Sequence, residues 1–176
     1  MKHLIIGNGI AGISVAETIR KNRSDDQISI ISNEEGAPYW RASLSKYILD
    51  IIPPGKMLIK PDGWFDQQNI EQIKGEVQQI DGSGKKIHLK QNGTETELGF
   101  DRCCVSIGAD PISLPIPGND LPEILAFRSL AQADQLKTAM TSIKNIVVIG
   151  GGVLGMEVVE LAVANRLNCI VLQRGN

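Results

Sequence analysis

The stretch Gly7-Asn8-Gly9-Ile10-Ala11-Gly12 decides how this sequence is expected to fold. It follows a short apolar run, His3 to Gly7, which is typical of a buried parallel strand. It precedes Ile13 to Arg20, where apolar residues recur on one face at helical spacing. A second β-rich run, Ile28 to Ile31, comes next and ends in polar residues. The order strand, glycine turn, helix, strand predicts a parallel βαβ unit.

The three glycines of this turn have separate roles in a dinucleotide site. Gly7 allows the tight turn, Gly9 lets a pyrophosphate approach the backbone, and Gly12 packs the helix on the strand. The N–H groups at Ile10 and Ala11 would meet the phosphates at the positive end of the helix dipole. The alternative interpretation is the same βαβ unit without a ligand.

An acid follows the second strand, as a dinucleotide site requires. Glu34, with Asn33 beside it, lies 22 residues after Gly12. A carboxylate at this place can hold ribose hydroxyls. The pattern therefore predicts a bound dinucleotide rather than a glycine-rich loop alone.

The arrangement recurs near the end of the chain. An apolar strand at Asn145 to Ile149 leads into a second glycine turn, an apolar helix from Met156 to Ala164 and a strand from Cys169 to Leu172. The residues of this turn that we expect to bind a nucleotide are Gly150, Gly152, Val153, Leu154 and Gly155. Two such turns predict two dinucleotides, and a redox enzyme is the usual reason to hold two.

The acid is not repeated in the second unit. The last strand ends in Gln173 and Arg174. Gln173 could hydrogen-bond a ribose, whereas Arg174 could pair with a 2′-phosphate, so the choice between NADH and NADPH stays open.

The residues between the two turns predict short helices, a small antiparallel sheet and a linker. We expect helices near Ser43 to Leu49, Pro61 to Gln68 and Leu130 to Met140, an antiparallel excursion at Glu76 to Phe100, a buried strand at Cys103 to Ile107 and a proline-rich linker from Pro111 to Gly118. The predicted fold is α/β, Rossmann-like, with two dinucleotide-binding domains, 1–117 for FAD and 118–176 for NAD(P). The second domain would be truncated and the first would lack a C-terminal return segment.

Composition excludes several other classes. The net charge is −2 over 176 residues without a basic stripe, which argues against nucleic acid. No apolar run reaches the roughly 18 residues that span a bilayer, and no secretory signal is recognisable, so we expect a cytoplasmic protein that does not bind membranes. Cys103, Cys104 and Cys169 show neither disulfide nor metal-ligand spacing, and we expect no metal. His3 and His88 have no evident acid-base partner and receive no role.

Several segments resemble one family of flavoproteins over the whole chain. The run Pro38 to Lys46 (PYWRASLSK) looks like the P-Y-x-R-x-x-L-S-K segment of rubredoxin and ferredoxin reductases, and is similar to the flavin-binding region of NADH-dependent nitrite reductases. Asp101 to Pro111 resembles their Y-D-K-L-x-x-A-T-G-x-x-P segment, but has Ser106-Ile107 where Ala-Thr is usual. The chain is thus identified as a member of the pyridine nucleotide-disulfide oxidoreductase superfamily.

The resemblance implies further site residues. Arg41 and Lys46 would approach FAD, with the Lys46 ammonium near flavin N5, where it would stabilise the reduced, anionic flavin. Glu157 would pair with Lys46 beside the nicotinamide; the alternative is two solvated charges. Val77 would offer backbone groups to adenine. The segment Ser106, Ile107 and Gly108 would pass beside the FAD.

The resemblance also implies the chemistry. Relatives that act on disulfides or peroxides carry redox cysteines after the second strand, and residues 36–60 contain none. We therefore expect NAD(P)H to give a hydride to FAD, with electrons leaving singly to a rubredoxin- or ferredoxin-like protein or a nitrite-reductase-type module.

The ending of the chain suggests a second hypothesis. The second unit has only two strands, so we expect a fragment, a truncated form, or one piece completed by a second chain or an oligomer. Such a chain would be a non-catalytic nucleotide-binding module that retains FAD weakly.

Overall fold

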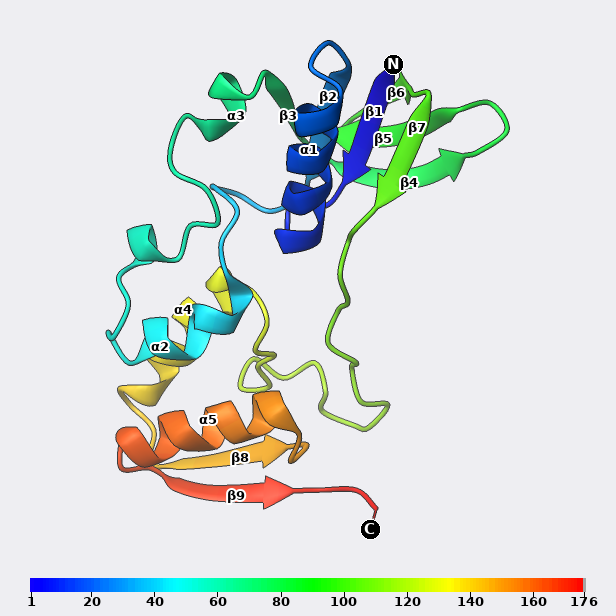
Figure 1. The fold of residues 1–176 in the computed structure, drawn as a ribbon. Coiled ribbons are helices and arrows are strands. Elements are labelled where there is room, and N and C mark those ends of the chain that lie inside the picture. The colour runs from blue at the N-terminus through cyan, green and yellow to red at the C-terminus, as the bar shows by residue number, and fades with distance from the viewer. Residues whose placement is uncertain (176) are drawn as a thin grey trace. The chain divides into compact units, whose positions relative to one another are not determined.

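The computed structural model describes residues 1–175, which form two compact units (Figure 1). The first comprises Met1–Trp40 and Leu58–Ala109, and the second comprises Arg41–Met57 and the residues from Asp110 onward. The elements of the first unit are β1 (Lys2–Ile6), α1 (Ile10–Asn22), β2 (Gln27–Ser32), α3 (Trp64–Gln67), β3 (Ile70–Lys74), β4 (Glu76–Asp81), β5 (Lys86–Gln91), β6 (Thr94–Gly99) and β7 (Arg102–Val105). Those of the second are η1 (Arg41–Ser43), α2 (Leu44–Ile48), η2 (Pro54–Lys56), α4 (Leu130–Met140), β8 (Asn145–Ile149), α5 (Val153–Ala164) and β9 (Asn168–Leu172).

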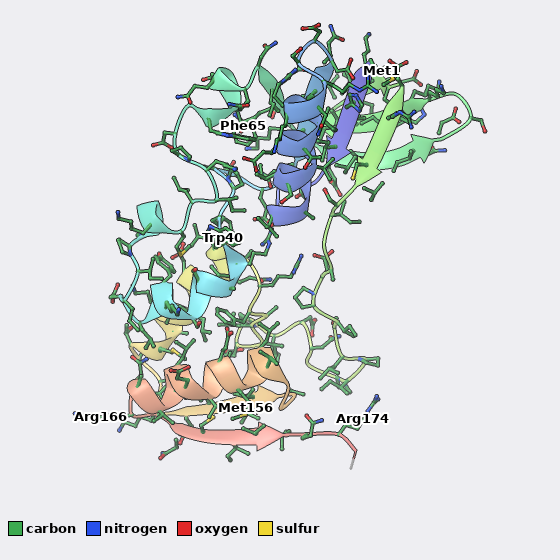
Figure 2. All side chains as sticks on the ribbon, viewed as in Figure 1. Met1, Trp40, Phe65, Met156, Arg166 and Arg174 are labelled. Carbon is green, nitrogen blue, oxygen red and sulfur yellow. The ribbon has the colours of Figure 1, made fainter. Side chains whose placement is uncertain are left out.

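The first unit is built on a parallel sheet in the order β3-β2-β1-β7, with α1 as the crossover between β1 and β2. Side chains alternate between the two faces of a strand. On one face, Ile5 packs with Ile13 and Ala16 of α1 and with the aromatic pair Trp64–Phe65, whose rings meet edge to face (Figure 2 labels Phe65). This face of the sheet therefore depends on the helical spacing predicted for α1.

The opposite face of the parallel sheet is covered by a second, antiparallel sheet. Leu4 and Ile6 of β1 pack there against Ile87 and Leu89 of β5. The antiparallel sheet has the order β4-β5-β6, and its second hairpin turns at Asn92 and Gly93, both with positive φ. Because β1 is covered on both faces, its buried residues Leu4, Ile5 and Ile6 form an uninterrupted apolar run after Lys2 and His3.

Three details of this unit differ from the sequence predictions. The strand predicted as buried at Cys103 to Ile107 is the edge strand β7 within the described sheet, and Val105 and Ile107 are exposed because no helix covers them there. Cys103 and Cys104 do point to opposite faces, as predicted, but each is only half-buried. The helix predicted from Pro61 is confined to α3, because Gly63 precedes it with φ of +76°.

The second unit packs three helices with a two-stranded parallel sheet. Helix α4 begins with a capping box between Ser129 and Gln132 and contacts α2, which also contacts α5. Strands β8 and β9 pair in parallel, and α5 lies against them (Figure 1). On their other face, Val147, Ile149, Ile170 and Leu172 are more than half exposed. The segment between β7 and α4 contains no helix or strand in the described residues, as its prolines predicted.

Candidate functional site

The first glycine turn has the backbone geometry that a dinucleotide turn requires. Gly7 has φ of +104°, which favours glycine, and its N–H donates to the Ile31 carbonyl at 2.8 Å. A Cβ on Gly12 would lie 1.9 Å from the Gly7 oxygen, whereas a Cβ on Gly9 would meet nothing within 4 Å. The turn therefore leaves space at Gly9 and none at Gly12.

The N-terminus of α1 opens from this turn without a side-chain cap. Gly9 is the N-cap residue, no side chain bonds to it, and no acid occupies the first turn. The first amides of a helix have no intrahelical partners, so those at Ile10 and Ala11 remain donors at the positive end of the dipole. Both side chains are exposed, so they do not bury these donors.

The acid predicted to hold a ribose lies in the same unit, just past β2. The Glu34 carboxylate accepts a hydrogen bond from the Tyr39 hydroxyl at 3.1 Å. A hollow of about 370 Å³ lies between the glycine turn and this acid, and its lining includes Asn8, Ser32 and Glu34. Asn33 is exposed and does not line the hollow.

One side of the hollow is lined by residues that the sequence did not predict to lie there. Glu35 on one side forms an ion pair with Lys74 at the end of β3, which lowers the pKa of the Glu35 carboxyl. Gln72 and Ile73 of β3 complete that side. The parallel pairing of β3 with β2 brings Gln72, Ile73 and Lys74 to the hollow. The sequence indicates a strand at this place but does not show which strand it pairs with.

The segment after β7 packs against the first glycine turn. Ser106 donates its backbone N–H to the Ile6 carbonyl at 2.8 Å, and its hydroxyl lies 3.0 Å from that oxygen and 3.1 Å from the Gly7 oxygen. A Cβ on Gly7 would lie 2.3 Å from the backbone carbonyl oxygen of Ser106. Ile107 is exposed and Gly108 has φ of +74°. Ser106, which stands where alanine is usual in the segment that this chain resembles, thus connects the end of β7 to the glycine turn by hydrogen bonds.

The second glycine turn reproduces the geometry of the first. Gly150 has φ of +106°, and its N–H donates to the Leu172 carbonyl at 2.8 Å. A Cβ on Gly155 would lie 1.8 Å from the Gly150 oxygen, and one on Gly152 would meet nothing within 4 Å. Gly152 is the N-cap residue of α5 and has no side-chain cap. Val153 and Leu154, at the start of α5, are both exposed.

The last strand of the second unit ends against this turn. The Gln173 side-chain oxygen accepts a hydrogen bond from the Gly151 N–H at 2.6 Å. Gln173 is therefore in contact with the second glycine turn.

The predicted pair of Lys46 and Glu157 lies within the second unit. Lys46 is exposed on α2, Glu157 is half-buried on α5, and these two helices are in contact. Among the described residues, neither side chain makes an ion pair or hydrogen bond, so their pairing stays a prediction. Arg41 donates to the Arg128 carbonyl at 3.2 Å. The contact of Val77 with adenine also stays a prediction; Val77 is half-buried where β4 shifts register.

The histidines have carboxylate partners that the sequence did not reveal. His3 Nε2 lies 2.8 Å from Asp26, and His88 Nδ1 lies 3.4 Å from Glu97. Hydrogen bonds from the N-terminal ammonium and from His3 lower the pKa of Asp26 to about 2. The expectation of isolated histidines was wrong, but the His3 pair lies at the end of β1 opposite the glycine turn.

No helix in residues 1–175 is both long and apolar enough to cross a membrane.

Comparison with known proteins gives consistent relatives over nearly the whole chain. The chain is 31% identical to the ferredoxin–NAD(+) reductase subunit of the benzene 1,2-dioxygenase system of Pseudomonas putida, over 98% of this chain and 42% of that protein. It is 32% identical to rhodocoxin reductase of Rhodococcus erythropolis, over 98% of this chain and 40% of that protein. The chain thus spans about two fifths of the length of these relatives.

Solved structures of proteins with similar sequences have the same fold as this chain. The crystal structure of the ferredoxin reductase for the CYP199A2 system of Rhodopseudomonas palustris has a TM-score of 0.89 and 32% identity, over 97% of this chain and 42% of that one. The reduced CoADR-RHD protein of Bacillus anthracis has a TM-score of 0.92 at 25% identity, over 99% of this chain and 33% of that one. These likenesses confirm the predicted α/β fold with its small antiparallel sheet.

The profile of one family, described as pyridine nucleotide-disulphide oxidoreductase, matches residues 1–175. This chain, with its two equivalent glycine turns, belongs to the pyridine nucleotide-disulphide oxidoreductase family.

Proposed function

We propose that this chain supplies the FAD-binding unit and the start of the NAD(P)H-binding unit of a flavoprotein reductase. The supporting observation is that Gly7 and Gly150, with φ of +104° and +106°, open two turns of the same geometry, each at the uncapped N-terminus of a helix. In this proposal residues 1–117 belong to the FAD domain and residues 118–176 to the NAD(P) domain. The whole reductase would pass a hydride from NAD(P)H to FAD and release the electrons singly.

The first turn fits the pyrophosphate of a dinucleotide. Space at Gly9 and the donors at Ile10 and Ala11 suit two phosphates, and the hollow toward Glu34 suits the adenosine ribose. Val77 and the segment Ser106–Gly108 would complete the binding of FAD. Bound FAD supplies a group that accepts two electrons together and releases them one at a time.

The second turn would bind the nicotinamide nucleotide in the same way. Space at Gly152 and the amides of Val153 and Leu154 suit its pyrophosphate. Gly155 holds α5 close to β8, as Gly12 holds α1 close to β1. The nucleotide would thus lie at the carboxyl ends of β8 and β9, where parallel sheets bind ligands.

Lys46 and Glu157 have the proposed catalytic roles. An ammonium beside flavin N5 favours the reduced, anionic flavin, and a carboxylate paired with that ammonium would orient it. Arg41 would bind FAD. Support comes from the family match and from the contact of α2 with α5.

The proposed electron acceptor is a small iron protein. Relatives that this chain matches at 31% and 32% identity are named as ferredoxin and rhodocoxin reductases, and another is named as a rubredoxin-NAD(+) reductase. Residues 36–60 contain no cysteine, which disfavours thiol chemistry beside the flavin. Cys103 is an unsuitable nucleophile, because burial raises the pKa of its thiol.

An absorption spectrum of the purified protein, before and after NADH or NADPH is added without oxygen, tests the proposal. Flavin bands near about 450 nm that bleach are expected. Bands that persist with both nucleotides would contradict the reductase. Absence of flavin after reconstitution would favour the alternative, a non-catalytic module completed by another chain.

A further inference from the structure

We propose that Asn8 is a site of spontaneous deamidation that bound FAD protects, so that protein left without flavin loses its ability to bind it. This inference rests on the proposed function, because it concerns the glycine turn that would hold the FAD pyrophosphate. Asn8-Gly9 is one of the two Asn-Gly sequences in the chain, and the other is Asn92-Gly93. Asparagine deamidates most easily before glycine, since glycine has no side chain to hinder attack by its backbone nitrogen.

The reaction needs only Asn8, Gly9 and water. The Gly9 backbone nitrogen forms a bond to the Asn8 side-chain carbonyl carbon, the carbon–nitrogen bond of the side-chain amide breaks, and ammonia leaves with the proton from Gly9. Water then opens the resulting cyclic imide at either of its carbonyls. The products are aspartate and isoaspartate, in which the main chain runs through the former side chain. No group is oxidised or reduced.

Neither reacting group is restrained by a hydrogen bond. Within residues 1–175, the Asn8 side chain makes no hydrogen bond, and the Gly9 N–H makes none either. Gly9 is the N-cap residue of α1, so its N–H lies outside the hydrogen bonds of the helix. Apart from its chain neighbours, no heavy atom lies within 4 Å of the place where a Cβ on Gly9 would be. The surroundings therefore leave room for the ring to close.

Bound FAD would cover the reacting groups. Asn8 is half-buried and lines the hollow that extends toward Glu34. The proposed function places the pyrophosphate at Gly9 and the adenosine ribose in this hollow. FAD bound there would exclude water from the Asn8 amide, and the hydrogen bonds of its phosphates would hold the turn in place. Deamidation is therefore expected in the protein that has lost its flavin.

Both products of deamidation oppose the return of FAD. Aspartate at position 8 would place a negative charge beside the phosphates, at a helix N-terminus that otherwise suits anions. Isoaspartate would lengthen the main chain between Gly7 and Gly9 by a methylene group. That change would disturb Gly7, which packs closely against the backbone of Ser106. Each converted molecule would therefore stay without flavin.

Incubation at mildly alkaline pH with and without FAD, followed by peptide mass spectrometry, measures conversion at each Asn-Gly sequence. Asn8 should convert progressively in the flavin-free protein. FAD at about ten times its Kd should slow this conversion about tenfold, because only the free fraction reacts. Asn92 is an internal control, since it is exposed in the turn between β5 and β6 and does not line the hollow. Its conversion should proceed at the same rate with and without FAD.

Three variants connect the conversion to flavin binding. Asn8→Asp should raise the Kd for FAD at least about tenfold, because like charges repel. Asn8→Gln has a longer side chain that closes the ring far more slowly, so it should keep its initial capacity for FAD throughout the flavin-free incubation. Asn92→Gln is the matched control and should lose capacity as the parent protein does.

Other results overturn the proposal. Equal conversion of Asn8 with and without FAD, or equal slowing at Asn8 and Asn92, would exclude protection by contact with the flavin nucleotide. Unconverted Asn8 in the flavin-free protein, or an unaltered Kd in Asn8→Asp, would also overturn it while leaving the reductase intact. Fresh protein that does not bind FAD would overturn the proposed function together with this inference.

Discussion

Substituting Gly12 by alanine should destabilise the protein, whereas the same substitution at Gly9 should spare the fold and weaken FAD binding. Both glycines belong to the first turn and differ in what surrounds them. A Cβ on Gly12 would lie 1.9 Å from the Gly7 oxygen and 2.9 Å from the Ser106 hydroxyl oxygen. A Cβ on Gly9 would lie in open space.

The magnitude at Gly12 follows from the contacts. An ordinary contact begins at 3.4 Å, so the first turn of α1 and the end of β1 would have to separate by about 1.5 Å. That separation would strain the Gly7 hydrogen bond to Ile31 and the Ser106 contacts. Overpacking of this kind costs up to roughly 3 kcal/mol, and alanine returns about 1 kcal/mol in helix propensity. The net loss is about 2 kcal/mol, or roughly 4–8 °C in Tm.

At Gly9 the balance is different. Alanine at an N-cap costs about 1 kcal/mol or less relative to glycine, so the Tm of the flavin-free protein should change by a few degrees. The new methyl group would occupy the space proposed for the pyrophosphate. We expect the Kd for FAD to rise at least about tenfold.

Thermal unfolding followed by circular dichroism, without FAD, measures the first effect, and flavin fluorescence during titration measures the second. Gly152→Ala is a matched control, because it repeats the open position in the other unit and should leave FAD binding unchanged. A flavin-free Gly12→Ala protein that melts within about 2 °C of the parent would refute the steric reasoning. Unaltered FAD affinity in Gly9→Ala would refute the placement of the pyrophosphate.

Three further predictions concern single side chains. Lys46→Met should slow reduction of bound FAD by NAD(P)H at least about tenfold, measured by stopped flow, because the charge proposed beside the reduced flavin is lost. Acid should weaken the fold through Asp26: its folded pKa is about 2 against an ordinary 3.8, so its stabilising contribution is complete above pH 3.8 and is lost as the pH falls toward 2. This loss should be absent from Asp26→Asn when unfolding is compared over that range. Tyr47→Phe should cost about 0.5–1.5 kcal/mol in urea unfolding, because the hydroxyl donates to Asp134, a bond that also raises the pKa of Tyr47.

These predictions have their own controls. Lys56→Met removes an exposed lysine of η2 from the same unit and should leave flavin reduction unchanged. Equal rates in Lys46→Met and the parent would exclude the catalytic role. Parallel acid curves for Asp26→Asn and the parent would exclude Asp26 as a source of acid sensitivity. Unchanged urea unfolding of Tyr47→Phe would show that water replaces Asp134 without loss.

Local features of the sequence predicted most of the elements. The glycine spacing, the apolar runs and the Asn92-Gly93 turn located both βαβ units and the antiparallel sheet, because each depends on residues close together in the chain. Helix α4 was predicted at Leu130–Met140, where the structure has it. The Ser129–Gln132 capping box is a further local signal of where this helix begins.

Contacts between residues that are distant in the chain could not be predicted from local sequence features. His3 meets Asp26, Lys74 meets Glu35, and Ser106 meets Gly7 only because parallel strands align their ends after a crossover of many residues. The edge position of β7 has the same origin, since the exposure of Val105 depends on which strands flank it. Hydrophobicity indicates that a strand is present but does not state its neighbours.

The sequence by itself therefore determined the kind of fold and the two glycine turns, because a positive φ and a close backbone contact require glycine at set spacings. Only the tertiary structure decided what surrounds those turns. It showed that a side chain at Gly9 would meet open space, that one at Gly12 would clash with the Gly7 oxygen, and that the Gln173 side chain accepts a hydrogen bond from Gly151. Each of these findings depends on where a separate strand ends.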